Sequence, residues 1–347
     1  MLESPLAGEG TETNPYEIET AFDLQLMAED LDANYTLVAD VDANETADWN
    51  DGDGLEPVGD ADDPFEGSLS GSFDGDGHEI ENLTASVPDG DAGHAGLFGA
   101  TKNASVSDVT LVDANVTAGT DGHAGALAGS QDGGTIADST VTDSAVRTRG
   151  DTFSNKVGGL VGSATGTLTG VEATGVIETE DETLGGVVGV LDEGSAVSDV
   201  SLDDLDLDVG DGGSVDGAGL LSASGEDDVT LEDVSIPTDL TLDVEEIEYL
   251  GGLVGDAGTA DDWRVDDADV SGDLNMQANG SIAQTGLIAG EAGDGWNLTN
   301  ADVSGAVDAT AGGSIEAIGA VGEAGHDWRV ADTELAGGVN AAAAEDV

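Results

Sequence analysis

The phrase VGGLVG occupies residues 157–162, and close variants follow at 184–189 (LGGVVG) and 250–255 (LGGLVG). Each phrase is far shorter than the roughly 20 apolar residues that cross a bilayer. The glycine before its apolar residues returns about every 33 residues, which is typical of a repeat protein. These aligned glycines are Gly96, Gly125, Gly159, Gly186, Gly219, Gly252, Gly286 and Gly319. The spacing predicts eight units of about 33 residues within 96–347.

Each unit also carries an alternating run: one apolar residue, two polar, one apolar, one polar, one apolar. Val106, Val109 and Leu111 set the pattern. It repeats at Val197, Val200 and Leu202, at Val265, Ala268 and Val270, and at Leu298, Ala301 and Val303. Short alternating runs between Gly, Asp, Asn and Ser are typical of strands and turns. The last three units add Trp263, Trp296 and Trp328.

A unit of this size cannot bury an apolar face alone, whereas a stack of units can. Leucine-rich repeats need a shorter period, and propeller blades need about 40 to 45 residues. The sequence therefore predicts an all-β fold, a right-handed parallel β-helix (solenoid). The glycine phrase would form one bent side of each coil, because glycine allows a sharp corner or a close approach.

Residues 1–95 differ from the repeats and are predicted to form an N-terminal cap and the first coils. A helix is predicted over 20–33, where Thr20 and Asp23 have the spacing of a capping box. Phe22, Leu26 and Met27 are expected to share one face of it. Such a helix would cover the exposed strand edge at the end of the stack. A strand is predicted over 35–43, and a hairpin-like or coil segment with a tight DGDG turn over 65–87.

The chain of 347 residues has 75 acidic and 6 basic side chains, which give a formal net charge of −69. Charges screen each other over about 10 Å at 0.1 M salt and about 3 Å at 1 M. A compact body with this charge is expected in a hypersaline environment. The charge also excludes nucleic acid as a partner. No cysteine is present, which excludes disulfides and thiolate metal sites.

The ordered motifs resemble GLUG-repeat surface proteins. Residues 10–42 (GTETNPYEIETAFDLQLMAEDLDANYTLVADVD), 64–84 (PFEGSLSGSFDGDGHEIENLT) and 95–99 (AGLFG) look like the opening module of that family, and the GGLVG phrases look like its motif. The resemblance covers essentially the whole chain. It implies a scaffold of secreted or cell-surface, adhesin-like proteins, with no chemistry of its own.

An enzyme is not expected. Adjacent carboxylates arise by chance in so acidic a chain, and no nucleophile elbow, phosphate loop or metalloprotease motif is present. Arg264 and Arg329 hold the same place in two units and are interpreted as structural, capping a turn or pairing with an aspartate. His94 and His123 are also equivalent, which indicates architecture, with a stacked metal-binding pair as the alternative.

No cofactor is expected except calcium or another bound cation. The segment DVDANETADWND (40–51) has oxygen-bearing side chains at alternating spacing, although it lacks the glycine and glutamate of an EF-hand loop. The candidate ligands are Asp40, Asp42, Asn44, Asp48 and Asp51. A solvated acidic loop is the alternative interpretation.

Seven asparagines begin an N-x-S/T triplet, the acceptor of N-linked glycans in exported proteins. They are Asn34, Asn44, Asn82, Asn103, Asn115, Asn279 and Asn297. The same triplet also arises when a turn asparagine precedes an outward strand threonine, and both interpretations stay open.

The sequence thus predicts a non-enzymatic extracellular or cell-surface module of a halophile, adhesive or structural. The alternative is a virion protein of a halophilic virus, such as a tail fibre, turret or receptor-binding protein, which the absence of a signal-peptide pattern favours. The expected partner is a protein or glycan receptor on a cell or host surface, with no direct membrane insertion. The strands near Val330, Leu335 and Val339 lack a lid, so self-assembly through this C-terminal end is also expected.

Overall fold

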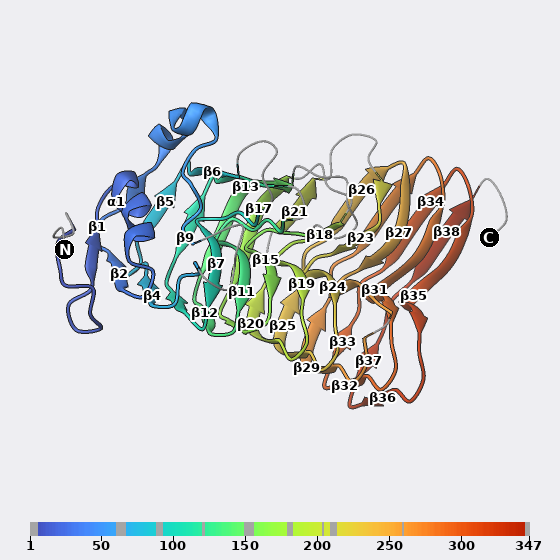
Figure 1. The fold of residues 1–347 in the computed structure, drawn as a ribbon. Coiled ribbons are helices and arrows are strands. Elements are labelled where there is room, and N and C mark those ends of the chain that lie inside the picture. Colours follow the sequence, from blue (N-terminus) through green and yellow to red (C-terminus); the bar gives the residue numbers. More distant parts are fainter. Residues whose placement is uncertain are drawn as a thin grey trace.

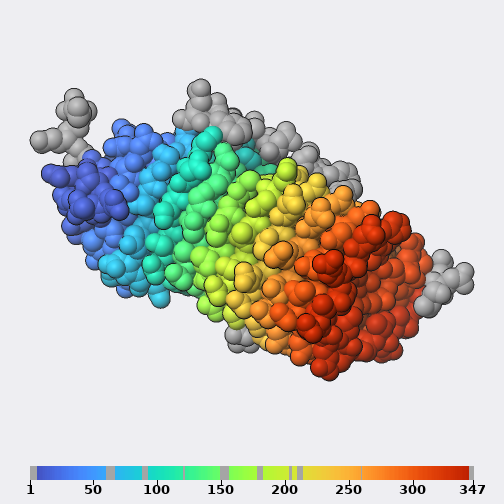
Figure 2. All heavy atoms as spheres, turned by 90° about the horizontal axis from the view of Figure 1, so that it is seen from below, coloured from blue at the N-terminus to red at the C-terminus, as the bar shows by residue number. Residues whose placement is uncertain are grey.

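The computed structural model describes residues 6–59, 67–87, 93–119, 122–148, 156–178, 183–202, 205–208, 214–258 and 260–343. The chain winds into a parallel β-helix, with the N- and C-terminal ends at opposite ends of the stack (Figure 1). Figure 2 shows the same order on the surface, where successive parts of the sequence form successive bands along the body. The predicted all-β solenoid is confirmed.

Three sheets run along the axis, and all of their strand pairs are parallel. One sheet has 21 strands: β1 (Tyr16–Ile18), β2 (Asn34–Leu37), β3 (Val41–Asp42), β4 (Ser72–Asp74), β5 (Glu79–Glu81), β6 (Thr84–Ser86), β8 (Ser105–Ser107), β9 (Thr110–Val112), β10 (Asn115–Ala118), β12 (Thr135–Ala137), β13 (Thr140–Thr148), β16 (Thr167–Thr169), β17 (Glu172–Glu178), β20 (Ala196–Ser201), β21 (Leu205–Asp208), β25 (Thr230–Ile236), β29 (Arg264–Val270), β32 (Asn297–Thr299), β33 (Asp302–Val303), β36 (Arg329–Ala331) and β37 (Glu334–Leu335).

The second sheet contains the glycine phrases. Its 13 strands are β7 (Phe98–Lys102), β11 (Ala128–Asp132), β14 (Val157–Gly158), β15 (Val161–Ala164), β18 (Thr183–Gly185), β19 (Val188–Leu191), β22 (Ser214–Val215), β23 (Gly217–Gly219), β24 (Ser222–Gly225), β27 (Glu246–Gly251), β28 (Val254–Ala257), β31 (Ile282–Ala292) and β35 (Ile315–Ala324). A third sheet of 4 strands is formed by β26 (Leu240–Val244), β30 (Leu274–Ala278), β34 (Val307–Ala311) and β38 (Val339–Ala343).

The alternating runs are strands that turn a corner. Val265, Ala268 and Val270 of β29 are at most 3% exposed, as predicted from the pattern. The second polar residue of the run, Asp267, has φ of 53°, in the left-handed region. This residue bends the chain, so that the apolar residues on both sides of the corner point inward. The other three predicted apolar sets are equally buried.

The glycine phrases bend as predicted, but their glycines form two columns. The chain bends at Gly159, Gly186 and Gly252, each between two short strands. The other five aligned glycines do not pair with these three. They lie in register with the residue before each of them, which is the first glycine of the Gly-Gly pair. The resulting glycine column runs through every coil: Gly96, Gly125, Gly158, Gly185, Gly219, Gly251, Gly286 and Gly319.

Close backbone approach explains these columns. A Cβ atom at Gly252 would lie 2.1 Å from the carbonyl oxygen of Leu287 in the next coil. A Cβ atom at Gly251 would lie 1.8 Å from the carbonyl oxygen of Val254. No side chain fits at such distances, so the aligned phrase follows from the tight corner.

The N-terminal cap contains a shorter helix than predicted. Helix α1 spans Ala21–Leu26 and continues as the 3-10 turn η1 (Met27–Glu29). The capping box is confirmed, because Asp23 N donates to Thr20 Oγ1 and Thr20 N donates to the Asp23 carboxylate. The predicted apolar face is confirmed at Met27, which is buried, and wrong at Phe22, which is 58% exposed. Leu26 is half-buried, and the buried residues within the helix are Ala21 and Leu24.

The rest of the cap joins the stack directly. The segment 34–42 is broken into β2 and β3, and two 3-10 turns follow, η2 (Asn44–Asp48) and η3 (Asn50–Gly52). β4 and β5 pair with β8 and β9 of the next coil and not with each other. The predicted DGDG turn is therefore a corner of a coil, with Asp76 and Gly77 in the left-handed region.

The C-terminal end of the stack leaves apolar side chains exposed. Val330, Leu335 and Val339 are 52%, 54% and 55% exposed. Their partners one coil earlier, Leu298, Val303 and Val307, are at most 2% exposed. This is the end at which the sequence predicts association.

Candidate functional site

Carboxylates line one corner of the stack in a column. The corner position in the left-handed region is filled in eight successive coils by Asp108, Asp138, Gly170, Asp199, Asp233, Asp267, Asn300 and Asp332. Asp, Asn and Gly are the residues that adopt this conformation most readily. Asp108 is exposed, yet desolvation raises the pKa of its carboxyl, and the nearby carboxylates of Asp74 and Asp138 raise it further. The fold therefore concentrates like charges along its length.

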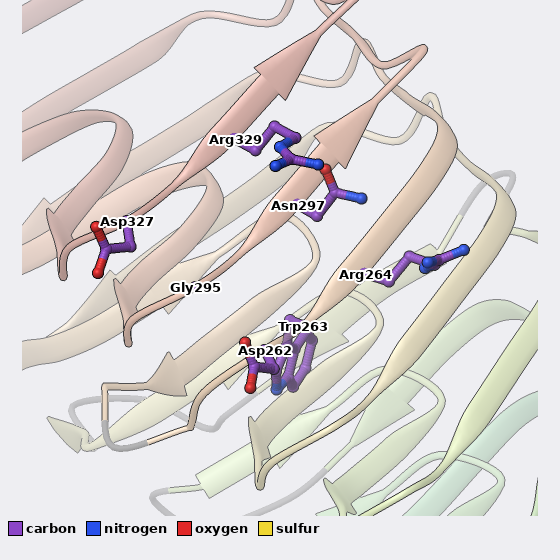
Figure 3. Close-up of a pocket in the computed structure, with 7 residues that line it drawn as sticks. All are labelled: Asp262, Trp263, Arg264, Gly295, Asn297, Asp327 and Arg329. Carbon is purple, nitrogen blue, oxygen red and sulfur yellow. The ribbon is translucent and has the colours of Figure 1, made fainter.

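A second corner holds an open hollow of about 360 Å³ (Figure 3). On one side lies the column Asp262, Gly295 and Asp327, all in the left-handed region. On the other side, Arg264, Asn297 and Arg329 follow each other on β29, β32 and β36. The middle coil has Gly295 between two aspartates and Asn297 between two arginines. These two shorter side chains leave the space of the hollow.

Trp263 lines the hollow and begins a stack of three tryptophans. The rings of Trp263 and Trp296 lie 4.7 Å apart and are nearly parallel, and Trp328 continues the stack at 5.2 Å. Each indole N–H donates to a carbonyl oxygen of the preceding coil. The stack begins at Trp263 because Val229 holds the equivalent position in the preceding coil. Gly225 of that coil leaves room for the indole, since a Cβ atom there would lie 2.2 Å from it.

The two arginines of the hollow are not paired. The interpretation that they cap a turn or pair with an aspartate is wrong for the described residues, in which neither guanidinium forms a hydrogen bond or ion pair. By contrast, Lys102 Nζ lies 3.3 Å from the carboxylate of Asp132. Between the arginines, Asn297 Oδ1 is buried and accepts no hydrogen bond.

The sequence contains a signal for this hollow. When DWRV, GWNL and DWRV are aligned on the tryptophan, the central unit replaces Asp with Gly and Arg with Asn. Only the stacking of coils shows that the two replacements face the same space. The equivalence of the two arginines could therefore be predicted from the sequence, but the hollow that they share could not.

The two histidines form a ladder with the backbone. Their rings stack at 5.0 Å. His94 Nδ1 accepts a hydrogen bond from His123 N, and His123 Nδ1 accepts one from Lys156 N. Burial lowers the pKa of His123 to about 4, with a smaller contribution from His94. Because each Nδ1 is already an acceptor, this arrangement favours the architectural interpretation of the pair.

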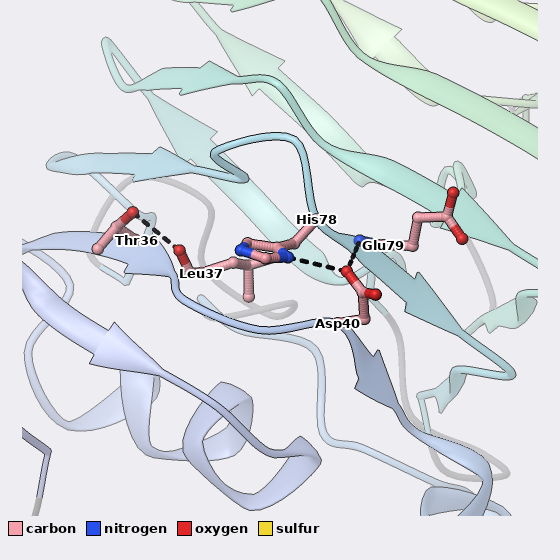
Figure 4. A network of polar contacts seen from close by, with 5 residues as sticks. All are labelled: Thr36, Leu37, Asp40, His78 and Glu79. Carbon is pink, nitrogen blue, oxygen red and sulfur yellow. Dashed lines mark hydrogen bonds and ion pairs between the residues drawn. The ribbon is translucent and has the colours of Figure 1, made fainter.

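The structure spreads the predicted calcium ligands over separate contacts. Asp40 accepts a hydrogen bond from His78 at 2.8 Å and another from Glu79 N, and His78 and Glu79 lie on the next coil (Figure 4). These contacts lower the pKa of the Asp40 carboxyl, with the His78 bond the larger cause. Asp42 instead accepts from Asn44 N and Asn82.

Asp48 and Asp51 lie further on, in η2 and η3. No three acidic or histidine side chains gather into a metal-binding group within the described residues. After β3 the chain continues into η2 and η3, and the calcium site stays a prediction from the sequence.

The seven candidate glycosylation sites differ in accessibility. Asn34 and Asn297 are half-buried, and Asn34 is held by hydrogen bonds with Gly10 and Ser72. The hydroxyl residue of the Asn44 triplet, Thr46, is fully buried. The exposed asparagines are Asn44, Asn82, Asn103, Asn115 and Asn279. Asn103 combines an exposed amide with an exposed Ser105, so we expect it to be the most accessible acceptor.

The chain is similar to two curated proteins over part of its length. It is 41% identical over 168 residues to Halomucin of Haloquadratum walsbyi, which covers 47% of this chain and 2% of that protein. It is 36% identical over 130 residues to a protein provisionally named a Gly-rich membrane protein of Evansella cellulosilytica, covering 36% of this chain and 14% of that protein. The matches thus span a small part of both relatives.

No protein family matches the sequence, so the GLUG resemblance remains a prediction from the motifs. Among solved structures, a protein of Bacteroides ovatus provisionally titled an immunoglobulin A1 protease has a TM-score of 0.45 at 17% identity. The match covers 84% of this chain and 86% of that one. Within the described residues, no helix has the length and apolar character needed to span a membrane.

Proposed function

We propose that this chain is a non-enzymatic module displayed on the surface of a halophilic cell, where it acts as a structural or adhesive β-helix. The observation that carries the proposal is the column of stacked carboxylates at the corners of the coils. Like charges at a strand spacing of about 4.8 Å repel each other strongly in dilute buffer. Molar salt shortens the reach of that repulsion to about 3 Å.

Two further observations support the proposal. The relative with the higher identity is named Halomucin. The described part of the chain offers stacked ladders of Trp and His, and no group of three acidic or histidine side chains that could hold a metal ion. A rigid rod with an acidic exterior suits a role as a spacer or binding surface outside the cell.

Labelling of intact cells of the source organism with an antibody against the chain tests the location. We expect the antibody to label unbroken cells in molar salt, and protease added outside to remove the label. Label that is reached only after lysis would overturn the surface assignment. Recovery with purified virus particles instead of cell envelopes would favour the virion alternative.

A further inference from the structure

The hollow at Gly295 has the chemistry of a binding site for an acidic sugar. Arg264 and Arg329 stand on strands that are separated by one strand, with the short Asn297 between them. A guanidinium presents a planar fork of N–H donors that matches a carboxylate. Two of the 6 basic residues of the chain thus face one opening, without partners among the described residues.

The acidic side chains on the opposite wall favour a ligand that also carries hydroxyl groups. The carboxylates of Asp262 and Asp327 flank the gap left by Gly295. They accept hydrogen bonds from hydroxyl groups and repel a ligand that is anionic on every side, such as sulfate or phosphate. The walls therefore suit a ligand with a carboxylate at one end and hydroxyls at the other.

The size and opening of the hollow suit one sugar ring. A volume of about 360 Å³ lies at the lower end of the range for small-molecule sites, about 300 to 1,000 Å³. Arg264, Asp262 and Asp327 are exposed, so the hollow opens to solvent on the outside of the coil. A ring within a longer polymer could enter from this side.

We propose that the hollow binds the carboxylate and hydroxyls of a uronic acid residue. The inference rests on the proposed surface function for its biological setting, since the source of the ligand would be an acidic polysaccharide outside the cell. The net charge of −69 opposes this binding in dilute buffer. In molar salt the repulsion reaches only about 3 Å, so the direct contacts with the arginines determine whether the ligand binds.

The chain offers a matched pair of variants. Gly295 and Gly170 are both corner glycines in the left-handed region, and in each case a Cβ atom would lie 2.5 Å from an aspartate Oδ1 of the preceding coil. Gly295→Asp fills the hollow with a third carboxylate. Gly170→Asp makes the same local change on another coil, away from the hollow.

The test is ligand-observed NMR on the purified chain in molar KCl, with D-glucuronate as the probe and D-glucose as its neutral counterpart. We expect glucuronate to bind and glucose not to bind. R264Q and R329Q should each weaken glucuronate binding at least tenfold, because each removes a charge-assisted contact. Gly295→Asp should abolish binding, and Gly170→Asp should leave it unchanged.

A glucuronate affinity no better than that of glucose would overturn the proposal. Equal affinity in wild type and Gly295→Asp, with both chains folded by circular dichroism, would also overturn it. If Gly295→Asp does not fold, R264Q and R329Q replace it, because both positions are exposed. Glucuronate affinity equal to that of wild type in both variants would then overturn the proposal. A glucuronate disaccharide that binds more tightly than the free sugar would identify a polymer as the source. Antibody labelling of cells is independent of these measurements, so the two proposals can fail separately.

Discussion

Single residues at the corners define the coil. At the corner that contains Asp267, eight successive coils place Asp, Asn or Gly in the left-handed region, where most other residue types would be strained. The same choice has two consequences, because an aspartate turns the chain and also adds a charge to the column. The acidity of the chain is therefore partly a property of its turns.

Gly252→Val tests the tight corner of the glycine phrase. A Cβ atom would meet the Leu287 carbonyl oxygen at 2.1 Å, so overpacking should cost about 1–3 kcal/mol or more. Asp269→Ser is the control, because Asp269 is an exposed residue of β29. Asp267 is unsuitable despite its exposure, since its φ of 53° favours Asp over Ser. Equal thermal midpoints for both variants in molar salt would contradict the corner.

The pH dependence of the histidine ladder is a second test at this scale. The pKa of His123 falls from 6.5 to about 4 on folding, so the unfolded chain takes up this proton more readily. The stabilisation is complete above pH 6.5 and is lost as the pH falls toward 4, by up to about 3 kcal/mol.

In His123→Asn, the amide oxygen can accept from Lys156 N without titrating. Unfolding by urea at several pH values in molar salt should show a smaller loss of stability for this variant between pH 6.5 and 4. The same loss in both chains would contradict a buried, neutral His123.

Among the elements, the strands could be predicted from sequence and the helix face could not. The strands could be predicted because each alternating run contains two successive polar residues between apolar ones. The second of these polar residues turns the corner of the coil, as Asp267 does. The face of α1 was wrong at Phe22 because the helix has only six residues, and its buried side chains are Ala21 and Leu24, followed by Met27 in η1. The hollow beside Trp263 was missed because it exists only between three coils.

The tryptophan stack links three of the last coils. Trp296 lies between two other indoles and is 1% exposed, whereas Trp328 is half-buried. Trp296→Ala should cost about 3–5 kcal/mol, because it leaves a cavity. Trp328→Ala should cost clearly less. Urea unfolding in molar salt gives both values, and equal costs would contradict a stack buried at its centre.

At the scale of the whole molecule, a continuous apolar core opposes a net charge of −69. The core runs from Leu6 to Ile315 and is interrupted by no polar layer within the described residues. The contacts of Asp40 with His78 and of Asp132 with Lys102 involve partly exposed side chains and contribute little. Screening by salt is therefore what allows the stacked carboxylates to remain close together.

The most direct test of this account is the thermal midpoint of the β-sheet circular dichroism signal across a KCl titration. We predict that the β signal is lost, or its midpoint falls steeply, as salt drops from molar concentration to about 0.1 M, where charges act over about 10 Å. Sucrose added at low salt should not restore the signal as KCl does, because it does not screen charge. An unchanged spectrum and midpoint down to about 0.1 M KCl would contradict the claim that salt holds this charged β-helix together.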